Sequence, residues 1–371
     1  MPLTPKLRES QSWDIALRAK SRTFGRVQTS LALLSLIWDF DASVSLILCV
    51  VPYYILGLTP KENNMNKKTI REVAALWKSD KQQYVKQSTM SAYALILENH
   101  ILPAFGDRFH LAEDDVQAFA LQKLNGGLSQ KTVKDTLIVL KMIQKFGVKA
   151  GLLEFTDWSI KYPTEQKSKE LEVLSISHQK KLMQYVTDNF TFRNLGIYIC
   201  LSTGMRIGEI CALKWNDIDI GTETIHVNRT IERIYIIEDG ERRTELVIGT
   251  PKTKNSIRDI PISKELMKLL RPLKKLVNDD YFVITNEEKP TEPRTYRNYY
   301  KQLLKQLDIP DLKFHGLRHS FATRCIESQC DYKTVSVILG HANISTTLNL
   351  YVHPNMEQKK KCINQMFKVL K

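Results

Sequence analysis

Cysteine is sparse in this chain, and its spacing does not suggest a disulfide or metal framework. The six cysteines among 371 residues form no CxxC pair, and no zinc-type arrangement of cysteine and histidine occurs. A chain of this length buries enough apolar surface to fold without disulfides. We therefore expect reduced, small and partly buried cysteines in a cytosolic protein.

Long apolar runs are also missing. The two apolar runs within residues 31–58 are separated by Asp39 and Asp41, whereas a membrane-spanning helix needs about 20 consecutive apolar residues. A signal peptide is excluded as well, because the apolar stretch lies far from the N-terminus and no A-x-A site follows it. We expect residues 1–64 to be spurious or disordered, with Met65 as the real or alternative start. A short membrane-associating segment is the other interpretation.

The sequence contains no glycine-rich phosphate loop and no pair of carboxylates suited to magnesium, which argues against a nucleotide-dependent or magnesium-dependent enzyme. His315 and His319 have the spacing of a zincin pair, but Gly316 stands where a zincin has glutamate, and no third ligand is evident. We expect neither a metal site nor another cofactor.

Basic side chains, by contrast, are in clear surplus. Lysine and arginine number 54 against 40 acidic residues, which gives a net charge of +14 and a pI near 9.3. Residues 166–371 hold most of the surplus, with 33 basic and 24 acidic side chains. Such a balance favours a polyanionic partner, with nucleic acid ahead of an anionic membrane. A basic protein without such a partner is the remaining alternative.

The pattern of residues 65–165 predicts a small all-helical domain. Apolar residues recur at helical spacing in the ranges 69–77, 88–100, 111–124 and 130–148. We expect the second helix to end before Pro103 and Ser129 to cap the last one. Four lysines of the last helix lie outside its apolar face, and we expect them to contact DNA, with a solvated face as the alternative: Lys131, Lys134, Lys141 and Lys145.

Residues 172–371 form a second expected domain, and the stretch 159–172, which contains Pro163 and a run of lysine and glutamate, is expected to be an exposed linker. This domain is patterned as mainly helical, with a strand-rich stretch between residues 223 and 262. Alternating apolar residues there predict strands of one small sheet, and Glu238-Asp239-Gly240 predicts a turn. The predicted fold class is therefore mainly α with a small antiparallel β-sheet (α+β).

Four short motifs in this second domain combine side chains that suit phosphate chemistry. In the first, Arg206 begins a predicted helix, and Glu209 lies on the same face three residues later, where it can orient the guanidinium. In the second, a turn between two strand-like runs can deliver Lys252 or Lys254 into a cleft. Taken alone, a surface ion pair and a solvated lysine are the commoner outcomes.

The third motif, HGLRH, projects His315 and Arg318 from one side of a predicted helix. The fourth joins His341 to Tyr351, with Ser345 as the expected N-cap of a helix that runs through the tyrosine. A lone tyrosine is far more often a core or surface residue than a nucleophile. The order and spacing of all four motifs therefore carry the interpretation.

Together the motifs resemble the signature of the tyrosine recombinase (phage integrase) family, in the contexts TGMRIGEI, HGLRHSFAT and LGHANISTT. The resemblance extends from about Met65 to the end of the chain. It implies a helical SAM-like core-binding domain at 65–165 and a tyrosine-recombinase catalytic domain at 172–371. It also implies six catalytic residues, with Glu209 supporting the first: Arg206, Lys252, His315, Arg318, His341 and Tyr351.

Arginine suits this reaction because two guanidinium groups can hold the non-bridging oxygens of a phosphodiester in fixed geometry, a role that falls to Arg206 and Arg318. The resemblance supplies the other roles. It implies that Tyr351 attacks phosphorus and leaves a 3′-phosphotyrosine, so that rejoining needs no nucleotide triphosphate. It implies that Lys252, with Lys254 as the alternative, protonates the leaving 5′-oxygen.

The resemblance further implies that His315 helps to move the tyrosine proton and that His341 hydrogen-bonds the scissile phosphate. It implies a cytoplasmic site-specific recombinase that integrates or excises a mobile element. The expected partners are double-stranded DNA, further copies of the chain in a homotetramer on two DNA sites, and an accessory DNA-bending or excision factor, but no membrane. The helical tail at 356–371 packs either on a neighbouring protomer or on its own domain. A type IB topoisomerase and a non-catalytic DNA-binding protein are the rival functions.

Overall fold

The computed structural model describes residues 67–164, 172–238, 241–251, 253–351 and 356–369. The N-terminal segment 1–64, residues 165–171 of the predicted linker, the centre of the predicted turn at 239–240 and Lys252 lie outside the described residues. Within the described part, no helix is long and apolar enough to cross a membrane.

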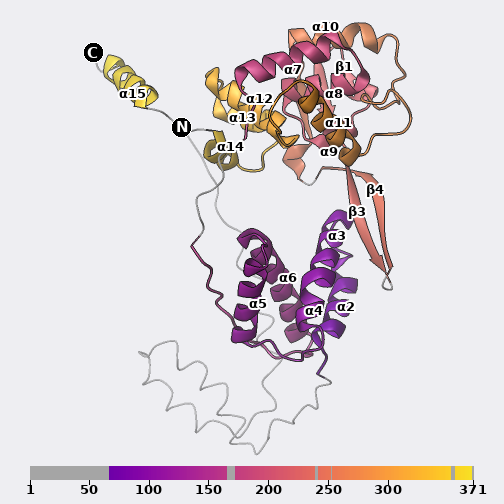
Figure 1. The fold of residues 1–371 in the computed structure, drawn as a ribbon, viewed down its shortest axis with the longest axis vertical. Helices are drawn as coiled ribbons and strands as arrows, with labels where there is room; N and C mark the ends of the chain where they lie inside the picture. Colours follow the sequence, from indigo (N-terminus) through magenta and orange to yellow (C-terminus); the bar gives the residue numbers. More distant parts are fainter. Residues whose placement is uncertain (1–66, 165–171, 239–240, 252, 352–355, 370–371) are drawn as a thin grey trace, which may run out of the picture. The chain divides into compact units, whose positions relative to one another are not determined.

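The first helices of the described chain pack around a shared apolar core (Figure 1). Thr69 begins the first helix through a capping box, in which its hydroxyl accepts from the Glu72 N–H and the Glu72 carboxylate accepts from the Thr69 N–H. The expected cap Ser129 is confirmed, because its hydroxyl accepts from the Thr132 N–H at 3.1 Å. These elements are α2 (Ile70–Lys81), α3 (Gln87–Ile96), the π-helical turn η1 (Leu97–Ile101), α4 (Leu102–Phe105), α5 (Glu113–Asn125) and α6 (Gln130–Lys149).

The prediction that the second helix ends before Pro103 is wrong. Helix α3 continues through η1 into α4, so that Pro103 lies in the first turn of α4. Proline cannot donate a backbone hydrogen bond, and the wider π-helical turn before it absorbs the irregularity. Leu97 and Ile101 of that turn are both buried, so the continued helix still contributes to the core.

The C-terminal part of the chain is built around α8 (Phe192–Thr203). Every residue from Asn194 to Leu201 is buried, so this helix has no stripe facing solvent. It packs against α7 and α12, among the other helices of this part. These are α7 (Ile176–Asp188), α9 (Ile207–Cys211), α10 (Lys264–Lys274), α11 (Pro293–Gln306), α12 (His315–Glu327), α13 (Tyr332–Leu339), α14 (Ile344–Tyr351) and α15 (Met356–Val369), with 3₁₀ turns at η2 (Trp215–Asp217) and η3 (Lys254–Ser256).

The strands form two antiparallel sheets where the sequence predicts one. The first sheet has the order β1-β2-β5, and the second is the β3–β4 hairpin. The hairpin separates from the first sheet because β3 packs on α9, where a side chain at Gly208 would meet the Ile231 carbonyl oxygen at 2.8 Å. The predicted α+β class is confirmed. The strands are β1 (Ile218–Asp219), β2 (Thr224–Val227), β3 (Thr230–Glu238), β4 (Glu241–Gly249) and β5 (Arg258–Pro261).

The N-terminus of α14 differs from the prediction that Ser345 caps it. The helix begins at Ile344, and the side-chain oxygen of Asn343 accepts from the Ser345 N–H at 2.9 Å. Asparagine is among the strongest N-cap residues, so Asn343 takes the role two residues before the predicted cap. The helix includes Tyr351, as the sequence predicts.

Apolar packing places this tyrosine among three helices. A small cluster contains Ala322 of α12, Val335 and Leu339 of α13, and Tyr351 of α14. It lies beside the main cluster of the C-terminal part, which draws on residues from Leu174 to Leu317. The tyrosine is therefore held by packing as well as by its place at the end of a helix.

Candidate active site

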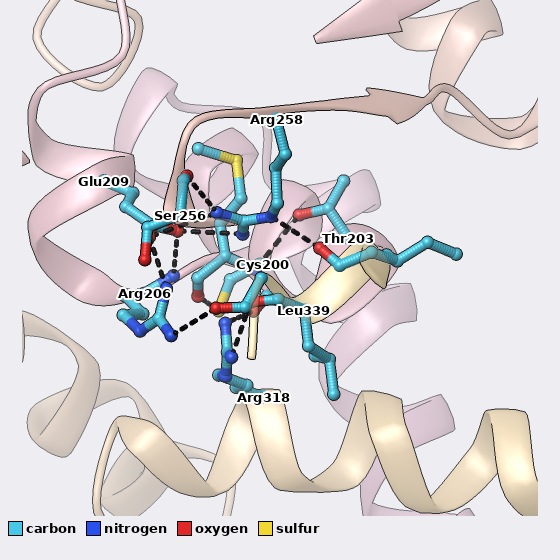
Figure 2. A network of polar contacts seen from close by, with 12 residues as sticks. Cys200, Thr203, Arg206, Glu209, Ser256, Arg258, Arg318 and Leu339 are labelled. Carbon is cyan, nitrogen blue, oxygen red and sulfur yellow. Dashed lines mark hydrogen bonds and ion pairs between the residues drawn. The ribbon is translucent and has the colours of Figure 1, made fainter. Parts of the chain in front are cut away.

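Arg206 stands at the junction of α8 and α9, where the chain turns sharply. Gly204 ends α8 in the left-handed conformation, with φ of 65°, which favours glycine. Arg206 is then the N-cap of α9, and its backbone N–H donates to the Glu209 carboxylate at 2.9 Å. Its guanidinium donates to Glu209 Oε1 at 2.8 Å and to the Gly340 carbonyl oxygen at 3.2 Å (Figure 2). Glu209 therefore holds this guanidinium in place.

A second arginine, Arg258 of β5, shares the carboxylate of Glu209. It donates to the two carboxylate oxygens at 3.2 and 3.0 Å, and both side chains are at most 5% exposed. Burial raises the pKa of the Glu209 carboxyl, but Arg258 and Arg206 outweigh that effect and hold the pKa below its ordinary value. Glu209 is thus ionised at neutral pH and joins Arg258 to Arg206 (Figure 2).

Sequence reasoning missed Arg258, although its strand carries a signal. Burial alternates along β5, so that Arg258 and Ile260 face inward while Asp259 faces outward. A charged residue on the apolar side of a strand is seldom buried without partners. Besides Glu209, Arg258 donates to the carbonyl oxygens of Ser256 and Ile338.

Arg318 of α12 is almost completely buried, at 2% exposed. Its guanidinium donates to the carbonyl oxygens of Gly204 at 2.9 Å and Leu339 at 2.7 Å, which fixes its orientation (Figure 2). Both acceptors are neutral, so the positive charge remains available to an anion. Burial and the nearby Arg206 lower the pKa of Arg318 to about 9. This electrostatic crowding of two cations is typical of a site that binds negative charge.

A cleft of about 920 Å³ opens beside these groups. Three of the side chains that the sequence assigns to catalysis line it, namely Arg206, His315 and His341. Arg294 and Arg297, one turn apart on α11, extend the basic lining. Four arginines and three glutamates line the cleft, and this small cationic excess on a concave surface favours an anionic ligand such as a phosphate.

The loop between β4 and β5, which is expected to carry the catalytic lysine, reaches the same cleft. Pro251 and Thr253, the sequence neighbours of Lys252, both line it. Lys252 lies outside the described residues, and Lys254 begins the short turn η3. The described parts of this loop therefore belong to the wall of the cleft.

The two histidines of the cleft are held neutral at physiological pH. His315 lines the cleft, but the surrounding protein still removes much of the water around its ring. This desolvation, together with His319 and Arg318, lowers the pKa of His315 to about 4. Burial and Arg318 lower the pKa of His341 to about 4 as well. His341 Nδ1 lies 2.8 Å from the buried Thr347 hydroxyl. When Nδ1 accepts from that hydroxyl, the neutral ring carries its proton on Nε2 and can donate it.

Tyr351 ends α14 and is only 8% exposed. Its hydroxyl lies 2.6 Å from Nδ1 of His319, whose ring packs edge-on against His315 with centroids 4.6 Å apart. Burial raises the pKa of Tyr351 to about 12, and the positive charge of Arg318 offsets only part of that rise. Sequence reasoning gave the phenol proton to His315 and overlooked His319, although both histidines of HGLRH lie one turn apart.

The four lysines expected to contact DNA are all exposed on α6. Two of them lie over aromatic rings, with the ammonium of Lys134 4.9 Å from the Tyr162 ring centre and that of Lys141 4.9 Å from the Trp158 ring centre. Such cation–π contacts leave the positive charge intact and steady the side chain on the helix surface.

The assembled groups suit a phosphodiester. Two fixed guanidinium groups supply positive charge, and two neutral imidazoles supply hydrogen bonds. The phenol of Tyr351 lies within electrostatic reach of Arg318, the more buried of the two arginines. Within the described ranges, no group of three or more histidine, cysteine, aspartate or glutamate side chains is placed to hold a metal ion.

Family models match both parts of the chain. The model of the phage integrase family matches residues 172–358, which is about half of the chain. The model of the phage integrase N-terminal SAM-like domain matches residues 69–108, within the helices α2 to α4. The expected SAM-like domain is thereby confirmed.

Known proteins of similar sequence are recombinases and integrases. A tyrosine recombinase XerC-like protein of Caldanaerobacter subterraneus subsp. tengcongensis is 30% identical over 274 residues, which cover 68% of this chain and 69% of the relative. The ICEBs1 integrase of Bacillus subtilis is 26% identical over 279 residues, which cover 71% of this chain and 74% of the relative.

Two solved structures share the fold. The Tn1549 transposon integrase in complex with a circular intermediate DNA matches with a TM-score of 0.64 at 20% identity, over 80% of this chain and 99% of that one. A lambda integrase tetramer bound to a Holliday junction matches with a TM-score of 0.55 at 16% identity, over 86% of this chain and 90% of that one.

Proposed function

This chain belongs to the phage integrase family of tyrosine recombinases, and we propose that it cleaves and rejoins DNA through a covalent bond to Tyr351. As a site-specific recombinase it acts through a 3′-phosphotyrosine intermediate and integrates or excises a mobile element. One observation carries the assignment of residues. Arg206, His315 and His341 line one cleft beside the buried Arg318.

Arg206 and Arg318 hold the scissile phosphate. Each guanidinium is fixed in advance, the first by Glu209 and the second by two carbonyl oxygens, so that binding of the phosphate needs little rearrangement. Negative charge gathers on the non-bridging oxygens in the transition state, where the two arginines act. Loss of one such donor typically lowers the rate by about 10²–10³-fold. His341 adds a neutral N–H donor to the same phosphate.

Two proton transfers accompany the exchange of bonds. The phenol of Tyr351 loses a proton as its oxygen bonds to phosphorus, and the leaving 5′-oxygen gains one. Lys252 is the acid for the second transfer, with Lys254 as the alternative, because Pro251 and Thr253 bring this loop to the cleft. The phosphotyrosine keeps the energy of the broken bond, so rejoining reverses the same steps.

Double-stranded DNA is the substrate, and a homotetramer holds two DNA sites, with an accessory DNA-bending or excision factor as a further partner. The fold shared with the lambda integrase tetramer on a Holliday junction supports this assembly. The catalytic domain at 172–371 supplies the cleft. The protein acts in the cytoplasm. The core-binding domain at 65–165 supplies a second, basic surface on α6. That surface consists of Lys131, Lys134, Lys141 and Lys145.

Helix α15 supports an assembly of several copies. Ile363, Met366 and Phe367 are 55%, 48% and 55% exposed on it. Large apolar side chains that gather at a surface in this way are typical of a face that packs against another chain. We assign α15 to a contact with a neighbouring protomer of the tetramer.

A nicked suicide duplex that carries the recognition site tests the proposed function. The chain should form a covalent protein–DNA adduct, and Tyr351→Phe should bind the duplex without forming one. An adduct that persists in Tyr351→Phe would overturn the choice of nucleophile. A plasmid with two sites should then yield recombinants, whereas relaxation without recombinants would favour a type IB topoisomerase.

A further inference from the structure

The phenol of Tyr351 has a histidine partner that the proposed function does not yet use. Its hydroxyl lies 2.6 Å from Nδ1 of His319, well within hydrogen-bond range. His319 belongs to α12 and Tyr351 to α14, so the contact joins two helices of the small apolar cluster. His315, one turn earlier on α12, touches the His319 ring rather than standing between it and the phenol.

The protonation states give this hydrogen bond a direction. Burial, together with Arg318, lowers the pKa of His319 below its ordinary value, so the ring is neutral at physiological pH. Burial raises the pKa of Tyr351 to about 12, so the phenol keeps its proton. A neutral ring with its proton on Nε2 accepts the phenol's hydrogen bond at Nδ1, and this is the arrangement that the proton transfer proposed below requires. Among the described residues, the titratable or charged groups that face the His319 ring are His315 and Arg318 of α12 and Tyr351 of α14.

We propose that His319, rather than His315, accepts the proton of Tyr351 during strand cleavage. This inference rests on the proposed function and adds one named step to it. The tyrosine oxygen forms a bond to phosphorus while its O–H bond breaks and the proton passes to His319 Nδ1. The bond from phosphorus to the 5′-oxygen breaks at the same time, and that oxygen takes a proton from the lysine ammonium. The reverse transfers accompany rejoining.

A weak base suffices for this transfer because the acidity of the phenol changes during the reaction. Before attack the phenol is a much weaker acid than the imidazolium, so no free phenolate forms. As the oxygen bonds to phosphorus it loses its affinity for the proton, and transfer to a base already in contact becomes favourable. The bound phosphate also brings negative charge beside Arg318, which offsets the repulsion between that guanidinium and a protonated His319.

The geometry indicates a different role for each of the two histidines. His315 lines the cleft, where a neutral ring can hydrogen-bond the phosphate or a leaving group. His319 does not line the cleft in the part of the chain that the structure describes, and it contacts the nucleophile directly. The two roles therefore predict different pH profiles for the two variants.

Single-turnover adduct formation on the suicide duplex, measured from pH 5 to 9, tests the proposal. In the natural chain the rate should fall at acid pH, below the ordinary histidine value of 6.5, as His319 becomes protonated, and should be flat at higher pH. His319→Gln keeps a hydrogen-bond acceptor but removes the base. It should cleave about 10²–10⁴-fold more slowly at pH 7, with a rate that rises about tenfold per pH unit. His315→Gln should be slower but keep the flat region.

His226→Gln is the matched control. His226 also bonds through Nδ1 at 2.6 Å, to Asp259, but it lies in the β1-β2-β5 sheet and not at the cleft. This variant should cleave like the natural chain at every pH. DNA binding by His319→Gln, measured alongside, should remain, which confirms that the variant folds.

Fluorinated tyrosine at position 351 gives a second test that leaves His319 in place. A more acidic phenol should restore much of the rate of His319→Gln, and in the natural chain it should not move the acidic limb of the pH profile. A bridging 5′-sulfur in the substrate should not rescue His319→Gln, because the defect lies on the nucleophile.

Three results would overturn the inference. These are a flat pH profile in His319→Gln, faster cleavage by that variant, or an acidic limb that shifts with the acidity of the phenol. If Tyr351→Phe still forms an adduct, the proposed function fails and the inference with it. If Tyr351→Phe forms none while His319→Gln keeps the natural profile, only the role of His319 is wrong.

Discussion

Arg258 and Glu209 form a buried ion pair with two contacts at the wall of the cleft, which Glu209 lines. The two guanidinium nitrogens of Arg258 lie 3.2 and 3.0 Å from the two carboxylate oxygens, and Arg206 binds the same carboxylate from the cleft side. Arg206 is thus anchored through the Glu209 carboxylate to Arg258 of β5, which lies 49 residues after Glu209 in the sequence. A bidentate pair of this kind fixes orientation as well as charge.

Arg258→Ala should lower both stability and activity. The substitution leaves the ionised Glu209 buried without its main partner, and breaking a buried pair in this way costs about 3–5 kcal/mol. The carboxylate also loses the partner that fixes its position, so it orients Arg206 less firmly and adduct formation should fall. Urea unfolding and the suicide-duplex assay measure the two effects.

The control for this variant is Arg271→Ala. Arg271 pairs with Glu223 at 3.5 Å, but both side chains are more than half exposed. Surface pairs contribute about 0–1 kcal/mol, so this variant should unfold close to the natural chain. Equal losses in Arg258→Ala and Arg271→Ala would contradict the anchoring role of the buried pair.

Stability should fall as the pH drops from 7 toward 4. The folded state lowers the pKa of His315 and of His341 to about 4, whereas an unfolded histidine titrates near its ordinary value of 6.5. Between these values the unfolded chain binds protons that the folded chain does not, so acid favours unfolding. Glu209, with its lowered pKa, acts in the same direction at more acid pH.

The double variant His315→Gln with His341→Gln isolates the histidine contribution. Its free energy of unfolding, measured in urea at pH 7, 6 and 5, should change less with pH than that of the natural chain. An identical pH dependence in the two proteins would show that these imidazoles are not held neutral by the fold.

The sequence predicts those features of the molecule that depend on interactions between residues close together in the chain. Thr69 and Ser129 begin helices through hydrogen bonds that span three residues, and the order of the four motifs is itself a property of the sequence. The π-helical turn at η1 was missed because proline normally ends a helix, and only the packing of Leu97 and Ile101 makes the continuation favourable.

The contacts that position the catalytic groups join distant segments, and spacing in the sequence does not reveal them. Arg258 and Glu209 are 49 residues apart, and His319 and Tyr351 are 32 residues apart. The family resemblance pointed to His315, and the motif alone does not separate the two histidines because both lie on α12. Only the packing of α14 against α12 decides which ring meets the phenol.

Salt should reveal which lysines of α6 contact DNA phosphates. Each phosphate contact contributes about 0.9 to the slope of log affinity against log salt concentration, because it releases counterions. Lys131→Ala and Lys145→Ala should therefore each reduce the slope by about that amount and weaken binding to all sequences alike. Fluorescence anisotropy at several salt concentrations measures the slope. Lys268→Ala on α10 is the control and should leave it unchanged, whereas unchanged slopes in the α6 variants would mean a solvated helix face.

Lys252→Ala should slow cleavage of an ordinary duplex far more than cleavage of one with sulfur in place of the 5′-oxygen. A thiolate is a good leaving group without a proton, so the sulfur substrate removes the need for an acid. Lys254→Ala, in the same loop, is the matched comparison and should be nearly as active as the natural chain on both substrates.

A sulfur rescue confined to Lys254→Ala would transfer the acid role to that residue. Equal defects of Lys252→Ala on both substrates would mean that the lysine binds the phosphate rather than protonating the leaving oxygen. The 5′-sulfur substrate is not expected to rescue His319→Gln. The same substrate therefore distinguishes a residue that protonates the leaving oxygen from a residue that accepts the proton of the tyrosine.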